Sequence, residues 1–253
     1  MLLSRLDGVV ARFVPSQISD LRWMAARRGL VWTLLWSGFL IAVSSAQVRA
    51  DEPKPAAKAE QADSEGWIDL FDGKSFDGWE GNLDWFRIED GCIVAGKLQG
   101  DIPRNEFLAT REKYGDFELR LQIKAIGEGV NAGIQFRTAR IPNHHEVSGY
   151  QADVGSGWWG KLYDESRRNR ILAGDDKTAP ESIVRKGDWN DYRIVCQGKR
   201  IQLYLNDHKT VDYTETDPDI ATDGIIAVQI HGGPPSEAWY RNIQLRPLKP
   251  VSR

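Results

Sequence analysis

The sequence has 253 residues, of which 27% are charged, and a formal net charge of −3. Residues 1–50 carry six Arg and two Asp, so the remainder has 27 basic and 34 acidic residues and a net charge of −7. This acidic balance disfavours nucleic acid or an anionic membrane surface as a partner.

The N-terminal segment has the pattern of a secretory signal. Arg27 and Arg28 precede an uncharged run, residues 29–43, and small residues lead to a cleavage site after Ala50. The run is short for a bilayer span, which needs about 20 apolar residues, although an uncleaved N-terminal anchor is the alternative. Met24 lies close to the basic flank, so we expect translation to start there. The prediction is an exported protein, periplasmic or extracellular, without a stable membrane partner after cleavage.

Beyond residue 50 the composition changes twice. Residues 51–65 are charged and rich in Ala and Pro without aromatic residues, which predicts a flexible linker. Residues 66–248 have the same pattern throughout, with short runs of β-branched and aromatic residues separated by Gly, Asp and Asn. This pattern and length suit one domain. Residues 249–253 form a tail.

Short alternating runs predict strands throughout this domain. They are residues 67–72, 85–90, 92–96, 117–126, 132–140, 149–155, 160–165, 193–198, 200–207, 224–233 and 239–248. Gly198 and Lys199 are the expected tip of a hairpin. Many strands without helices predict an all-β sandwich or barrel. Cys92 and Cys196 lie within strand-like runs, and we expect two buried thiols in preference to a disulfide.

Four of the predicted strands carry polar side chains on one face. A strand places successive side chains on opposite faces. The polar pairs are Gln135 with Arg137, Gln151 with Asp153, Lys161 with Tyr163, and Gln229 with His231. One interpretation is the solvated face of an antiparallel sheet. The other is a binding face, because these residue types can orient a ligand by hydrogen bonds.

Large aromatic residues favour the second interpretation. Trp158, Trp159 and Trp239 lie at the ends of these strands, and aromatic walls around a few polar groups suit sugar rings. By parity with Lys161, Trp159 is expected on the polar side, unless Gly160 carries a bulge. The alternative is that both adjacent tryptophans only fill the core or plug a hairpin.

Several stretches together resemble a known family. They include "GWIDLFDGKSFDGW" at 66–79, "NAGIQFR" at 131–137 and "YQAD" at 150–153. The order of motifs over residues 66–248 is similar to that of the 3-keto-disaccharide hydrolase domain family. The resemblance implies a concanavalin-A-like jelly roll of two curved antiparallel sheets with the site on the concave side. It also implies an exported, glycan-degrading protein. Many members have a Glu before the Gln of "YQAD", whereas this chain has Gly149 and Tyr150, which makes Asp153 the main acidic candidate.

The small number of candidate carboxylates near Asp153 limits the reactions that this face could catalyse. An ordinary glycosidase needs two carboxylates flanking the bond, and the positions two residues from Asp153 are Gln151 and Gly155. A 3-keto sugar needs instead one base for the acidic C2 proton, donors for the enolate oxygen and an acid for the leaving group. Elimination followed by water addition is then net hydrolysis.

The resulting hypothesis assigns a role to each candidate. Asp153 or His231 is the base or acid, and Arg137 and Lys161 hold the keto oxygen. Substrate hydroxyls are oriented by Gln151, Gln229 and Tyr163. The sugar ring stacks on Trp158 or Trp159. The structural alternatives are that Asp153 pairs with Arg137, and that His231 is only a turn residue.

Metal sites are weakly indicated. His144, His145 and Glu146 are sequence neighbours without a further ligand at a suggestive spacing, which disfavours zinc. Residues 215–223 hold four acids without EF-hand spacing, so a solvated turn is preferred to a loop calcium. No cofactor is identified.

The leading function is an exported enzyme acting on 3-keto glycosides, with a carbohydrate substrate as its partner. The alternatives are a non-catalytic carbohydrate-binding module and an ordinary glucanase, which a second acid from another strand would support.

Overall fold

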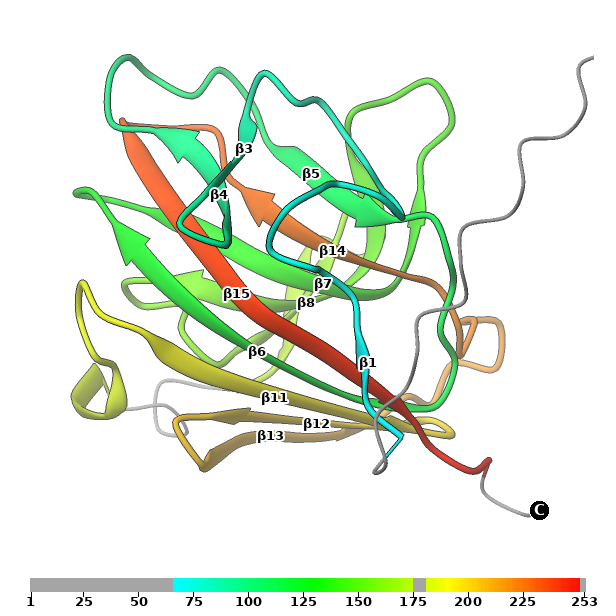
Figure 1. Cartoon of the computed structure of the whole chain (residues 1–253). Coiled ribbons are helices and arrows are strands. Elements are labelled where there is room, and N and C mark those ends of the chain that lie inside the picture. The colour runs from blue at the N-terminus through cyan, green and yellow to red at the C-terminus, as the bar shows by residue number, and fades with distance from the viewer. Residues whose placement is uncertain (1–65, 175–180, 251–253) are drawn as a thin grey trace, which may run out of the picture. The chain divides into compact units, whose positions relative to one another are not determined.

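The computed structural model describes residues 66–174 and 181–250, so the signal and linker predictions lie outside the described residues. The described chain folds into two antiparallel sheets packed face to face, as an all-β jelly-roll sandwich (Figure 1). Its only helical element there is a short 3₁₀ turn, η1 (Glu181–Ile183). The predicted fold class is confirmed.

We call the two layers sheet A and sheet B. Sheet A has the order β13 (His208–Thr214), β12 (Arg200–Leu205), β11 (Asn190–Gln197), β6 (Phe117–Ile126), β15 (Ser236–Pro247), β4 (Cys92–Lys97) and β3 (Phe86–Glu89), with β1 (Ile68–Asp69) paired to β15. Sheet B has the order β10 (Arg170–Ala173), β9 (Leu162–Glu165), β8 (Val147–Gly155), β7 (Asn131–Arg140), β14 (Ile225–Ile230), β5 (Glu106–Thr110) and β2 (Trp79–Glu80).

Strand alternation builds the core between the sheets. In β6, Phe117, Leu119, Leu121 and Ile123 are buried against sheet B, while the intervening polar residues face outward. Sheet B contributes the apolar side of its own alternation, including Ile134, Tyr150 and Val228, to the same core. The polar residues of β7, β8 and β14 are therefore left on the outer face of sheet B, away from sheet A.

The strand predictions were correct for the long runs and missed four short or edge strands. The hairpin tip at Gly198 is confirmed, since Gln197 pairs with Arg200. The missed strands are β2, β5, β10 and β13. Strand β13 follows a turn in which Asn206 and Asp207 both have positive φ, the geometry of a two-residue hairpin turn. Its charged and polar residues, suited to an edge strand, concealed it in the sequence.

Two further sequence predictions concern burial and membranes. Cys92 and Cys196 are both buried and free, so the prediction of two thiols is confirmed. In the part of the chain that the structure describes, no helix is long and apolar enough to cross a membrane.

Candidate functional site

The outer face of sheet B is polar but not solvated. Gln135, Gln151, Asp153 and Gln229 are each at most 3% exposed. Strand register places Gln229, Gly133 and Asp153 side by side in one row across β14, β7 and β8. The interpretation as a solvated face is therefore wrong, because buried polar side chains are retained only where they have partners or a function.

Hydrogen bonds join three of these side chains in a chain. Gln135 Nε2 donates to Gln151 Oε1, and Gln151 Nε2 donates to Asp153 Oδ1 at 2.5 Å. Gly133 makes room for this chain, since a Cβ there would lie 2.6 Å from Gln151 Cγ. Gln151 therefore fixes one oxygen of Asp153, which is a positioning role for the glutamine.

Two buried oxygen atoms of the row have no hydrogen-bond partner among the described residues. They are Asp153 Oδ2 and Gln229 Oε1. A buried acceptor left unpaired costs about 1–3 kcal/mol, so the arrangement is stable only with a compensating gain elsewhere. Such atoms are those expected to bind a proton or a ligand hydroxyl.

Glu165 provides a second carboxylate that the sequence reasoning missed. It ends β9, is 9% exposed, and pairs across the β8–β9 hairpin with Gly149, on the same face as Gln151 and Asp153. Gln229 Nε2 donates to its Oε2 at 3.4 Å. The signal was available: Glu165 is two residues after Tyr163, so strand parity already placed both on this face.

The two carboxyl groups have raised pKa values. Burial raises the pKa of Asp153 to about 8; the charge of Glu165 adds to the rise, while Gln151 and Lys161 oppose it. Burial also raises the pKa of Glu165 to about 7, and the charge of Glu146 contributes to the rise. Between these values the pair holds one proton, and such coupled groups titrate together. One member can then donate a proton while the other accepts one.

Lys161, Tyr163 and Trp158 gather at the β9 end of this face. Tyr163 pairs with Gln151, and Trp158 packs edge-on against its ring with the centroids 6.2 Å apart. Lys161 Nζ lies 5.9 Å from the Trp158 ring centroid, and its charge lowers the pKa of Asp153. Trp158 is 38% exposed, which leaves part of its ring open to a ligand.

The expected position of Trp159 on the polar side is wrong. Its ring is buried in the core and stacked on Tyr192, with the centroids 6.3 Å apart. The physical reason is that Trp159 lies in the turn between β8 and β9, and β9 begins only at Leu162, so strand parity with Lys161 does not extend to it. Gly160 ends this turn with a φ of +75°.

Arg137 is also not on the outer face. Its φ of +47° lies within a register shift of β7 between Phe136 and Ala139. The guanidinium donates to Asp116 Oδ1 at 2.8 Å and to the carbonyls of Gly115 and Gly198. The structure therefore places Arg137 in a buried ion pair that joins β7 to the β11–β12 hairpin, and its expected contact with a keto oxygen is not supported.

His231 remains at the edge of the site. It follows β14 and its backbone N–H donates to Asn131 O at 3.0 Å, one row beyond Gln229. Its Nδ1 lies 2.6 Å from Gly232 O and must donate to that carbonyl. No hydrogen bond or ion pair joins His231 to Asp153 within the described residues, so its catalytic role stays a prediction. Trp239, in contrast, lies on sheet A with Lys124 over its ring at 4.5 Å.

The acidic loop after β13 and the arginine-rich loop after β9 meet in a structural network. Burial alone would raise the pKa of Glu215, but hydrogen bonds from Arg168 and Tyr150 lower it to about 2. Arg167 and Arg168 also pair with the buried Asp164. Glu215 is thus an ion-pair partner.

No group of three or more His, Cys, Asp or Glu within the described residues is placed to hold a metal ion.

Two tyrosines from sheet A form hydrogen bonds to the main chain of the site from its core side. Tyr192 Oη donates to Asp153 O at 2.5 Å and accepts from the backbone N–H of Gly160 at 2.9 Å. Tyr240 Oη lies 2.6 Å from Gln229 O and 3.3 Å from Gly133 O. The backbone of the whole Gln229–Gly133–Asp153 row is therefore held through the core.

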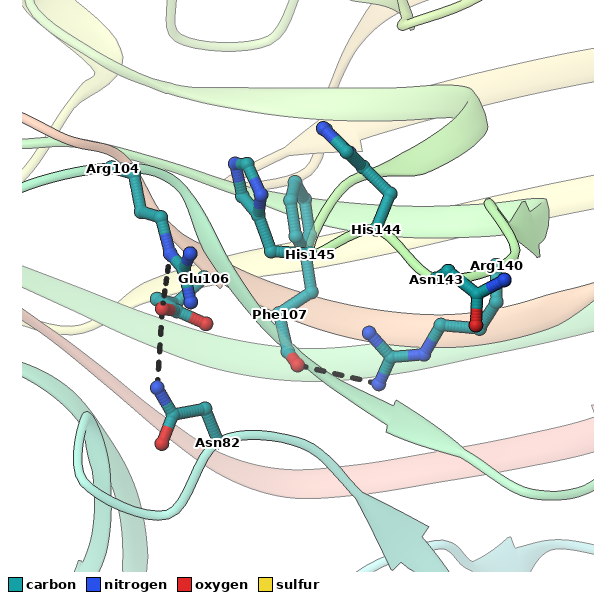
Figure 2. A pocket seen from close by; sticks show the side chains of 8 residues that line it. All are labelled: Asn82, Arg104, Glu106, Phe107, Arg140, Asn143, His144 and His145. Atoms are coloured by element: carbon teal, nitrogen blue, oxygen red, sulfur yellow. Dashed lines mark hydrogen bonds and ion pairs between the residues drawn. The ribbon is translucent and has the colours of Figure 1, made fainter. Parts of the chain in front are cut away.

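A pocket of about 610 Å³ lies at the β5 side of the same sheet (Figure 2). Its lining comprises Asn82, Arg104, Glu106, Phe107, Arg140, Asn143, His144 and His145. Phe107 pairs with Gln229, so the pocket continues the row that contains Asp153.

The face and its motifs match a known family. Residues 66–246 match the family model described as a 3-keto-alpha-glucoside-1,2-lyase-like domain. The chain belongs to this family. The lyase-like domain spans nearly all the described residues, and the resemblance inferred from the motifs is confirmed.

One named protein and two solved structures illustrate what this domain is similar to. A 3-keto-disaccharide hydrolase of Bacteroides thetaiotaomicron is 25% identical over 74% of this chain and 80% of its own length. A Parabacteroides distasonis structure, provisionally described as a glycosyl hydrolase, is 25% identical with a TM-score of 0.52, covering 72% of this chain and 99% of its own. The carbohydrate-binding module CBM66 of Bacillus subtilis has a TM-score of 0.50 at 14% identity, covers 74% of this chain and 99% of its own, and shares the fold alone.

Proposed function

We propose that this protein cleaves 3-keto glycosides by removal of the C2 proton, elimination of the C1 leaving group and addition of water. The observation that carries the proposal is the buried Asp153, with an unpartnered Oδ2, beside Glu165 on one face. A module that only binds sugar needs no such pair, whereas an ordinary glucanase would use one as well, so the choice of a 3-keto substrate over an unoxidised glycoside rests on the named relative. The B. thetaiotaomicron relative, a 3-keto-disaccharide hydrolase, supports the same reaction class.

We assign the base role to Glu165 and the acid role to Asp153. Burial raises the pKa of Glu165 to about 7, which suits a base that takes the C2 proton near neutral pH. The resulting enolate at C3 is stabilised by Lys161, whose charge already acts on this site. Asp153, whose pKa burial raises to about 8, gives its proton to the leaving oxygen as the C1–O bond breaks and the C1–C2 double bond forms.

The second half of the reaction reverses these roles. The ionised Asp153 takes a proton from water, whose oxygen adds to C1, and the protonated Glu165 returns a proton to C2. The net change is hydrolysis, and both carboxyl groups return to their starting state. Gln229, whose Nε2 donates to Glu165 Oε2 at 3.4 Å, holds this carboxylate in both halves of the proposed reaction.

The test compares a 3-keto disaccharide with its unoxidised parent. Purified protein is expected to release the leaving sugar from the keto form only, because the parent lacks an acidic C2 proton. Equal release from both would favour an ordinary glycosidase, whose paired carboxylates need no ketone. Release from neither, with binding retained in calorimetry, would favour the binding module.

Trp158 gives a second prediction. Trp158→Ala is expected to raise KM for the 3-keto substrate about two- to tenfold with kcat within twofold, because an exposed stacking ring contributes about 0.5–1.5 kcal/mol to binding in both the ground and transition states. Steady-state kinetics measures the split. Leu98→Ala, at another exposed apolar residue, is the control and should change neither constant. A loss confined to kcat would contradict the stacking role.

We further propose that the protein is exported and that its partner is a carbohydrate substrate. Both follow from the N-terminal segment and the sugar chemistry argued above. No cofactor enters the proposed reaction.

A further inference from the structure

The outer face of sheet A carries three arginines around one carboxylate. Arg120 Nη2 donates to Glu118 Oε1 at 2.7 Å, and Arg246 Nη2 donates to Glu118 Oε2 at 2.8 Å. Arg193 Nη1 lies 3.9 Å from Oε1 of the same carboxylate. The Glu118 side chain is 9% exposed, whereas those of the arginines are 35–53% exposed. This group therefore has a surplus of positive charge that faces solvent.

Arg193 is held in place without a hydrogen bond to its guanidinium. Strand register sets it directly opposite Arg120 across β11 and β6, and like charges in this position destabilise a sheet. The guanidinium stacks on Tyr204, 3.5 Å from the ring centroid, and makes no hydrogen bond within the part of the chain that the structure describes. Stacking fixes the guanidinium plane and leaves its edge available for a bidentate contact with a carboxylate.

A hollow of about 410 Å³ lies beside this arginine pair. Arg120 and Arg193 line its basic end, and Asp191 and Asp207 also line it. Asp191 precedes Arg193 by two residues on the same face of β11, which is roughly 7 Å along the strand. Asp207 lies near Asp191, because the backbone N–H of Asn206 donates to Asp191 O at 2.9 Å. The hollow therefore has a basic end and an acidic end.

The two ends fit different groups of one ligand. The basic end fits a carboxylate, and the acidic end fits hydroxyl groups, because an ionised Asp only accepts hydrogen bonds. Asp191 is already bound by Gln122 at 2.7 Å and by Arg185 at 3.0 Å, whereas Asp207 is exposed and makes no ion pair among the described residues. A sugar acid carries both kinds of group on one ring. Nucleic acid or an anionic membrane fits less well, because its many phosphates would meet the two aspartates.

We infer that this hollow binds a uronate residue of an acidic polysaccharide. Its carboxylate lies between Arg120 and Arg193, and a ring hydroxyl donates to Asp207. Strands β11 and β12 belong to the layer opposite to β8 (Figure 1). A bound polysaccharide thus leaves the face with Asp153 open. The inference is independent of the proposed function, since it concerns binding at a different surface.

The experiment measures binding of trigalacturonate and trimannuronate to the full chain by calorimetry. Wild-type protein is expected to bind at least one of them, and methyl esterification of its carboxylates should raise Kd at least about tenfold. Arg193→Gln should raise Kd for the free acid by a similar factor and have little effect on the ester. Arg200→Gln, at an exposed ion pair with Asp212 on the same sheet, is the matched control and should leave Kd unchanged.

Asp207→Asn distinguishes a uronate site from a simple anion site by the sign of its effect. For a uronate, Kd should rise about threefold, because an amide oxygen accepts a hydroxyl hydrogen bond more weakly than a carboxylate does. For a simple anion, Kd should fall, because a nearby negative charge has been removed. Melting temperatures show whether each variant is folded. If Arg193→Gln is not, Arg193→Lys takes its place, since it keeps the charge but loses the planar guanidinium.

Several results would overturn the inference. They are no binding of either uronate by wild-type protein, an unchanged Kd in the Arg193 variant, and a lower Kd in Asp207→Asn. Tighter binding of a sulfated oligosaccharide without carboxylates would assign the arginines to sulfate and overturn the uronate as well. Cleavage of a 3-keto disaccharide should be unchanged in both variants, and its absence in wild-type protein would count against the proposed function alone.

Discussion

Asp153→Asn is expected to lower kcat for a 3-keto disaccharide by about 10²- to 10⁴-fold, the usual cost of losing a general acid or base. Asparagine keeps the hydrogen bond to Gln151 but cannot give a proton to the leaving oxygen. The measurement is steady-state release of the leaving sugar. Wild-type turnover by this variant would remove Asp153 from the mechanism.

The leaving group distinguishes acid from base. With a 3-keto 4-nitrophenyl glycoside, whose leaving group departs without protonation, Asp153→Asn should recover most of the rate of 4-nitrophenol release in the first turnover, while the later addition of water still lacks its base. Glu165→Gln should be impaired with both substrates, because C2 proton removal is needed for each. The reverse pattern would exchange the two assignments, and equal losses with both substrates would contradict the division of roles.

The same variant has an expected effect on stability that depends on pH. The pKa of Asp153 is raised from 3.8 to about 8 in the folded protein, so between these values the folded state binds more protons than the unfolded state. The free energy of unfolding therefore falls as pH rises through this window, by up to about 1.4 kcal/mol per pH unit. Asp153→Asn should reduce the slope by up to this amount and leave the part that comes from Glu165, whose pKa is raised from 4.5 to about 7. Urea unfolding between pH 5 and 8 can measure the difference.

Arg137→Met is expected to lower the free energy of unfolding by about 3–5 kcal/mol, because it leaves Asp116 without its buried partner. The side chain of Arg137 is 2% exposed, and that of Asp116 is 13% exposed. The carbonyls of Gly115 and Gly198 lose a donor as well. Urea unfolding measures the change.

The activity of the folded variant distinguishes this role from catalysis. At a temperature where Arg137→Met is folded, its KM and kcat should stay close to those of wild type. Arg111→Met, at an exposed pair with Glu80, is the control, and surface pairs of this kind contribute about 0.2–1 kcal/mol. Unchanged stability with a large loss of kcat would return Arg137 to the catalytic site.

Strand alternation predicted the part of the site where the strands are regular. Gln151 and Asp153 on β8, Gln229 on β14 and Tyr163 on β9 all lie on the expected face. These positions follow from the two-residue period alone. The role of each side chain is a separate question, which the experiments above address.

Alternation failed where the backbone adopts a positive φ. Arg137 at +47° lies within a register shift of β7, and Gly160 at +75° ends the turn that contains Trp159, so neither Arg137 nor Trp159 follows the strand alternation. Residues other than glycine rarely adopt such angles, so Arg137 carried no sequence signal of the irregularity. Glu165 was missed for a different reason: it ends the predicted strand 160–165 with the parity of Tyr163, but only Lys161 and Tyr163 were assigned to the polar face of that strand.

The two tyrosines beneath the site bear on how this face can be transferred between proteins. Tyr192 and Tyr240 belong to β11 and β15 of the opposite sheet, yet their hydroxyls hold the main chain at Asp153 and Gln229. The site therefore depends on residues from both sheets of the sandwich. If the outer-face residues alone were transferred to another jelly roll, the reacting side chains would be present. The two tyrosine hydroxyls that fix the position of their main chain would be missing.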